Sequence, residues 1–144
     1  MSGRETPAQP RRPDWPERLA LLLESRHRMQ FAWGVHDCCL FAADAVEAMT
    51  GSDPAAAWRG SYSTEAGAEA IIGRIGLEGM VAAALEAFGA GACDPAFAQR
   101  GDVVLVLVGN QPTMGVCTGD AVAAPGPDGL VFVGLGDVLR AWSV

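Results

Sequence analysis

The sequence contains no histidine after position 36 and no lysine at all. Its two histidines are His27 and His36, and all other basic residues are arginines. A cysteine or serine nucleophile usually gives its proton to a histidine that the fold brings from elsewhere. A catalytic pair whose histidine comes from the second half of the chain is therefore excluded.

Long apolar runs are also missing. No segment approaches the roughly 20 apolar residues that a membrane-spanning helix needs. Residues 1–13 are polar and proline-bearing, without the apolar core of a signal peptide. We therefore expect no membrane span and synthesis in the bacterial cytoplasm, where the four cysteines would stay reduced.

Positive charge is scarce outside the N-terminus. Residues 31–144 hold four arginines against thirteen acidic residues, whereas residues 1–30 hold six arginines against four acidic residues. Because binding to phosphates needs clustered positive charge, the acidic body argues against a nucleic-acid partner. The arginine-bearing N-terminal arm is either solvated or docks on an acidic neighbour.

Sequence signatures of bound cofactors are absent as well. The chain has no Cys-x-x-Cys pair, no Gly-x-Gly-x-x-Gly fingerprint and no Walker-type loop. These patterns hold metals, dinucleotides and phosphates respectively. We expect no metal and no cofactor.

The chain is long enough for one domain with a buried core, since half of its 144 residues are hydrophobic. Helical patterns come first and strand patterns second, which predicts an α+β fold. We expect a flexible N-terminal arm over residues 1–13 and a single domain over residues 14–144.

Capping residues mark the starts of the expected helices. Asp14, followed by Pro16 and Glu17, begins a helix that runs to about residue 29. The next helix is expected from Asp37 to about residue 50, with Gly51 ending it. Two more helices are expected from residue 64 to near residue 76 and over residues 77–88.

Strand patterns begin after residue 100. The apolar run over residues 103–108 is typical of a central strand, because both of its faces would be buried. Shorter strands are expected over residues 113–118, 120–124 and 130–135. The segment 138–144 is expected to close the sheet.

Cys38 is the strongest candidate for a catalytic residue. It follows Asp37, which caps a helix, and backbone N–H groups at a helix start favour a thiolate. The helical spacing also places Cys38 on the buried face, with Cys39 turned about 100° away from it. The alternative interpretation is that Cys38 is a small buried residue of the core.

Two residues are candidates for a base beside Cys38. His36 is near in sequence, but it precedes the cap, and a structural role for it is the alternative. Asp120 could face the Cys38 end of the molecule, although a carboxylate is a poor base for a thiol unless its pKa is raised. Asp102 is expected to bond the backbone amides of the turn that follows it.

Three motifs resemble the NlpC-type cell-wall peptidases, which are small papain-like enzymes. Residues 37–40 (Asp-Cys-Cys-Leu) are similar to their Asp-Cys-Ser-Gly motif, and residues 101–105 (Gly-Asp-Val-Val-Leu) are similar to a strand opening in that family. Residues 113–119 (Thr-Met-Gly-Val-Cys-Thr-Gly) resemble the strand that carries their catalytic histidine. The resemblance implies a papain-like fold over residues 14–144, with Thr113 at the position of the base. It also implies that the helix of Cys38 packs against the strand of Cys117, so that these two cysteines approach one another.

A closer resemblance is to an uncharacterised family of phage-tail-associated proteins. The shared pattern includes Trp-Gly-x-His-Asp-Cys (33–38), Gly-x-Asp-Pro-Ala (51–55), Arg-Gly-x-Tyr-x-Thr (59–64) and a final Ala-Trp (141–142). It implies a structural component of a phage or phage-like tail, near the tail tip or baseplate. The partners would be other tail proteins, with possible contact to peptidoglycan.

The threonine at the position of the base decides between the functions that these resemblances imply. Thr113 cannot accept a proton at neutral pH, so we expect a degenerate peptidase site with Cys38 as its vestigial nucleophile. One alternative is an active cysteine hydrolase of peptidoglycan stem peptides, with His36, Asp120 or a partner protein supplying the base. A second is a binding module that holds a peptide without cutting it.

Overall fold

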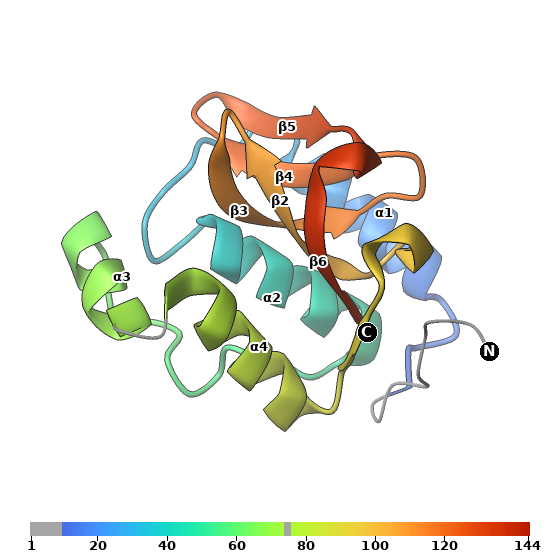
Figure 1. The fold of residues 1–144 in the computed structure, drawn as a ribbon, viewed down its shortest axis with the longest axis horizontal. Coiled ribbons are helices and arrows are strands. Elements are labelled where there is room, and N and C mark those ends of the chain that lie inside the picture. Colours follow the sequence, from blue (N-terminus) through green and yellow to red (C-terminus); the bar gives the residue numbers. More distant parts are fainter. Residues whose placement is uncertain (1–9, 74–75) are drawn as a thin grey trace.

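The computed structural model describes residues 10–73 and 76–144 and has an α+β fold, as the sequence predicts. Within these residues the α-helices come before the main strands (Figure 1). The helices are α1 (Trp15–Arg26), α2 (Cys38–Thr50), α3 (Glu65–Ile72) and α4 (Gly76–Phe88). The strands are β1 (Gly91–Cys93), β2 (Val103–Val108), β3 (Gln111–Cys117), β4 (Val122–Gly126), β5 (Gly129–Val133) and β6 (Val138–Ser143).

Helix α2 begins and ends where its capping residues predict. The Asp37 side chain accepts a hydrogen bond from the backbone N–H of Leu40 at 2.9 Å, which satisfies a donor that the first turn leaves open. At the other end Gly51 has a φ of 86°, a left-handed conformation that favours glycine. The helix is therefore specified at both ends by local sequence.

Helix α1 is shorter than predicted. It ends at Arg26 rather than near Met29, and His27 is its C-terminal cap. The carbonyl of His27 accepts a hydrogen bond from the backbone N–H of Leu130 in β5 at 3.0 Å. The segment after α1 thus pairs with a distant strand, a contact that helical periodicity cannot reveal.

The sheet is antiparallel, with the strand order β1-β6-β2-β3-β4-β5. Strand β2 is central, as predicted. The expectation that residues 138–144 close the sheet is wrong, because β6 lies between β2 and the short edge strand β1. Strand β1 was missed because its glycine-containing three residues carry no strand pattern.

Helix α2 packs against one face of this sheet, and α4 lies beside α2 and contributes Val81 and Leu85 to the same core (Figure 1). Both faces of β2 are buried, which explains its uninterrupted apolar sequence. The core between α2 and the sheet includes Phe41, Ala45, Met49, Leu105, Met114, Val116 and Trp142. The opposite face has a smaller cluster of Val104, Val106, Cys117, Val122 and Ala141.

The described end of the predicted arm is anchored rather than free. Arg11 donates to the carbonyl of Val144 at 2.6 Å and to the carboxylate of Asp102 at 3.1 Å. The backbone N–H of Arg12 donates to the carbonyl of Met49 at 2.7 Å. Buried acceptors thus hold the two arginines against the domain. Residues 1–9 of the expected arm lie outside the described part.

Within residues 10–73 and 76–144, none of the helices combines the length and the apolar character needed to cross a lipid bilayer.

Candidate functional site around Cys38

Cys38 is the first residue of α2 and is preceded by a fully engaged carboxylate. Asp37 is 1% exposed and accepts hydrogen bonds from the backbone N–H groups of Leu40 and Gly34 and from the hydroxyl of Tyr62. The same contacts hold the loop over residues 60–64 and the connector over residues 31–36 against the start of the helix. Asp37 is thus occupied with positioning the site.

The thiol lies where strands β3 and β4 separate. These strands pair only at Val116–Ala123 and Cys117–Val122, although β3 begins at Gln111. The backbone N–H of Met114, ahead of the paired part, donates to Cys38 instead. The fork between the two strands therefore receives the N-terminal end of α2.

The neighbouring thiol activates Cys38. The pKa of Cys38 is lowered, chiefly because the Cys39 thiol donates a hydrogen bond to it, and the Met114 N–H adds to this against the opposing effect of burial. The pKa of Cys39 is raised because its proton is held by Cys38 and because it is buried. The two thiols therefore interact, although helical spacing turns the two residues about 100° apart.

A cleft of about 430 Å³ opens over the two thiols. Its volume is within the usual range of about 300–1,000 Å³ for small-ligand sites. The connector, α3, the start of α4 and two hairpins contribute its walls. The lining residues are Phe31, Trp33, Asp37, Cys38, Cys39, Tyr62, Ala68, Ile71, Ile72, Leu77, Met80, Val108, Gln111, Pro112, Thr113, Pro125, Gly126, Pro127 and Val131.

Aromatic side chains line the cleft where it is bordered by the 31–36 connector and the loop over residues 60–64. Phe31 and Trp33 meet edge to face with their ring centroids 4.8 Å apart, and Tyr62 stacks on Trp58 at 6.4 Å. The pKa of Tyr62 is raised by burial and by its hydrogen bond to Asp37, so its hydroxyl stays protonated. The sequence alone did not predict that these aromatic side chains line the site.

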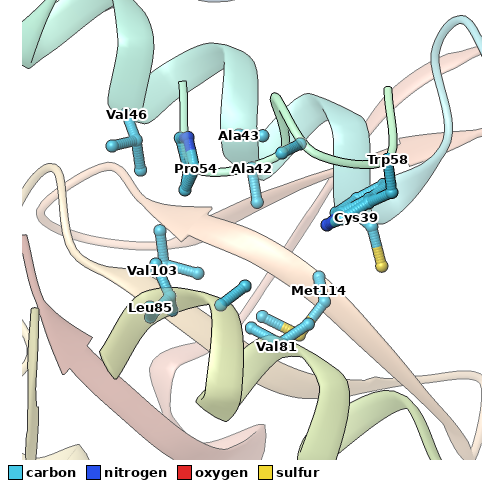
Figure 2. A pocket seen from close by; sticks show the side chains of 12 residues that line it. Cys39, Ala42, Ala43, Val46, Pro54, Trp58, Val81, Leu85, Val103 and Met114 are labelled. Atoms are coloured by element: carbon cyan, nitrogen blue, oxygen red, sulfur yellow. The ribbon is translucent and has the colours of Figure 1, made fainter. Parts of the chain in front are cut away.

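A second, much smaller cavity of about 30 Å³ lies behind Cys39. Figure 2 shows it between α2 and α4, with Cys39 and Trp58 at one end, Val46 at the other, and Met114 beside Val81. Its walls are apolar, so it offers no partner to water or to a polar ligand. The Cys39 side chain therefore separates a packing void from the open cleft.

A family model described as a domain of unknown function, DUF6950, matches residues 10–144. The match spans the anchored arginines, the cleft and the whole sheet. The chain belongs to the DUF6950 family. No curated protein matches it.

The fold of this DUF6950 chain places His36 away from the thiol. The imidazole is fully buried, its Nδ1 lies 3.0 Å from a guanidinium nitrogen of Arg26, and its ring meets Phe41 edge to face. Burial first, and then the charge of Arg26, lowers the pKa of His36, which keeps the ring neutral. Its side-chain contacts turn it toward Arg26 of α1 and give it a structural role.

Asp120 and Asp102 also lie apart from the thiol. Asp120 is exposed in the turn after Cys117, the end of β3, and that end lies about 10 Å from Met114 at 3.3 Å per residue. Its carboxylate accepts a hydrogen bond from the Thr118 hydroxyl. Asp102 is fully buried and accepts from the Gln99 N–H at 2.9 Å, in the turn before it rather than after it. Its partner across the chain is the Arg11 guanidinium.

The remaining cysteines form no cluster with Cys38. Cys117 belongs to the opposite face of the sheet, so the expected approach to Cys38 does not occur. Cys38, Cys39 and Cys117 of this family member are free thiols. Among residues 10–73 and 76–144, no group of three or more His, Cys, Asp or Glu side chains could hold a metal ion.

Proposed function

We propose that the chain is a non-hydrolytic domain of papain-like, NlpC-type architecture that serves as a structural component of a phage or phage-like tail. One observation supports the loss of hydrolysis most directly. The cleft residue that precedes Met114 is Thr113, and Met114 is the residue whose N–H reaches Cys38. A threonine hydroxyl cannot take the proton of a thiol at neutral pH.

No other group in the cleft replaces the missing base. Of the described residues that line it, none is a histidine, Asp37 is engaged by three donors, and Tyr62 keeps its proton. A positioned general base contributes roughly 100- to 10,000-fold to a rate. Attack on an amide and the later release of an acyl group by water would both lack that contribution.

The element order supports the NlpC-type interpretation. A cysteine begins the core helix, and an antiparallel sheet follows in sequence and packs against that helix. The strand with Thr113 starts beside the cysteine, which is the arrangement that the resemblance implies. These features are the reason for choosing this architecture among α+β folds.

The tail assignment rests on the resemblance to phage-tail-associated proteins. In this proposal the chain is made in the cytoplasm and is incorporated near the tail tip or baseplate, against other tail proteins. Its net charge of −7 suits contact with protein neighbours better than contact with packaged DNA. A cleft that binds a peptide without cutting it is compatible with this role.

A second function, hydrolysis of peptidoglycan stem peptides, is favoured by the lowered pKa of Cys38 and by its access to an open cleft. In that case a partner protein would have to supply the base, because neither His36 nor Asp120 contacts the thiol. The two functions differ in whether Cys38 turns over a substrate.

The deciding experiment combines particle composition with activity. Phage-like particles produced with the wild-type chain or with Cys38→Ala should contain equal amounts of the protein by mass spectrometry, and neither protein should solubilise peptidoglycan. The alkylation of Cys38 should show an apparent pKa below the roughly 8.5 of a free thiol. Thr113→His tests the missing base, and Thr118→His, at the other end of β3, is its matched control.

Peptidoglycan release by the wild-type protein that Cys38→Ala abolishes would establish the hydrolase instead. Absence of the chain from purified particles would remove the tail assignment. A gain of hydrolysis in Thr113→His alone would show that the site lacks only its base.

A further inference from the structure

The cleft over Cys38 offers a ligand apolar walls and little polar recognition. Its sides include Ile71, Ile72, Leu77, Met80 and Val131, and none of the described lining residues is a cation. Asp37, its one carboxylate, is already bound by three donors. This lining suits an uncharged aliphatic chain and gives no partner to a phosphate or a carboxylate.

The donors that face Cys38 lie together beside the thiol, whereas Gln111, another polar residue of the lining, is exposed at the start of β3. The Met114 N–H and the Cys39 thiol both point at Cys38, while Thr113 lies next to them. An extended peptide would need partners for each buried amide, since an unmatched one costs roughly 1–3 kcal/mol in proteins. An acyl chain carries a single carbonyl at one end, which matches a site with donors at one end.

We propose that Cys38 accepts an aliphatic acyl group from an acyl thioester and holds it as a stable thioester, with the chain lying in the apolar cleft. The inference rests on the proposed absence of a hydrolytic base. Without a base to activate water, the acyl group stays on the protein.

The exchange balances without any oxidant or metal. The Cys38 thiolate attacks the carbonyl carbon of the donor thioester and forms a new C–S bond, and the Met114 N–H is placed to donate to the oxygen that becomes negative. The bond between that carbon and the donor sulfur then breaks. The donor leaves as a thiolate, which takes a proton from water.

The test uses the full-length chain and the octanoyl thioester of N-acetylcysteamine, with the acetyl thioester as the short-chain comparison. Intact-protein mass spectrometry should show one octanoyl group, located on Cys38 by peptide mapping and removed by hydroxylamine. The octanoyl group should transfer about tenfold faster than the acetyl group, since each additional buried methylene is favourable. Cys38→Ser should abolish the adduct, and Cys93→Ser is the matched control.

A second variant separates the cleft from the thiol. Met80→Asp places a charge in the wall and should slow octanoyl transfer more than acetyl transfer, which would reduce the preference for the octanoyl group. If Cys38 is alkylated by iodoacetamide but takes no octanoyl group, the inference fails and the proposed non-hydrolytic function stands. If the adduct forms and water releases it with turnover, both fail. Equal labelling of the other cysteines would also overturn the inference.

Discussion

The two ends of α2 are built in opposite ways. At the C-terminal end, Arg11, Arg12 and the start of β2 close around Met49, and the last residue of the chain lies beside them (Figure 1). At the N-terminal end, Cys38 lies under an open cleft whose walls come from several segments far apart in the sequence. One end of the helix is clamped, and the other is exposed to ligands.

The difference follows from how each end satisfies its polar groups. The clamped end uses a guanidinium that bonds two carbonyls and the carboxylate of Asp102 at once. The open end uses Asp37, which faces inward and leaves the thiols as the polar surface of the cleft. The hydrogen bonds of Arg11 hold the C-terminal end of α2 in place, while Cys38 at the N-terminal end is open to the cleft.

The largest effect is expected from breaking the clamp. Arg11→Ala removes the guanidinium from a carboxylate that is fully buried, which costs about 3–5 kcal/mol of unfolding free energy. Urea denaturation followed by tryptophan fluorescence measures this loss. Arg18→Ala, which breaks the exposed pair with Asp14, is the control and should cost far less, because solvent screens that pair. Equal losses of unfolding free energy in the two variants would mean that the buried pair of Arg11 and Asp102 stabilises the fold no more than an exposed pair does.

A smaller effect is expected at the open end. Asp37→Ala removes the cap of α2 and the anchor of Tyr62, and should lower the unfolding free energy by about 2–3 kcal/mol. Thr64→Ala removes the exposed cap of α3 and should cost about 1 kcal/mol. Because Asp37 also holds the cleft wall, its variant should lose the selective alkylation of Cys38. Unchanged alkylation in a folded Asp37→Ala protein would contradict the positioning role.

The smallest effect is expected from protonating His36, which lies at the open end but faces α1. Its folded pKa is lowered from 6.5, so the unfolded state binds more protons as the pH falls below that value. Stability should therefore be complete above about pH 6.5 and decline in more acidic solution. Denaturation at pH 7.5 and pH 5.5 should show this decline in the wild type and less of it in His36→Gln. His27→Gln should behave as the wild type, and the same slope in all three proteins would exclude His36 as the cause.

Local sequence predicted the elements whose signals are local. Asp37 and Gly51 marked α2 correctly, Thr64 marked the start of α3, and the apolar run of β2 indicated a central strand. The placement of β6 and the existence of β1 were not predictable, because three residues with two small side chains pair through their backbones alone. The end of α1 was missed for the same kind of reason, a backbone contact with β5.

The candidate site likewise combines residues that local sequence predicted with contacts that it did not predict. The choice of Cys38 came from its cap, and the doubt about a base came from the absence of later histidines. The contact of Cys38 with Met114, the interaction with Cys39 and the wall contributed by Tyr62 all join segments far apart or depend on rotamers. Helical spacing described the backbone directions of the two cysteines but not where their sulfur atoms would meet.

By itself, the sequence determined the helix boundaries set by caps, the buried central strand and the lack of a downstream histidine, since each depends on residue type and short spacing. The tertiary structure alone decided that Arg11 clamps the fold, that His36 turns away from the thiol, and that β3 and β4 separate over Cys38. Those features arise when distant segments compete for the same buried hydrogen-bonding groups, and that competition is resolved only in the packed chain.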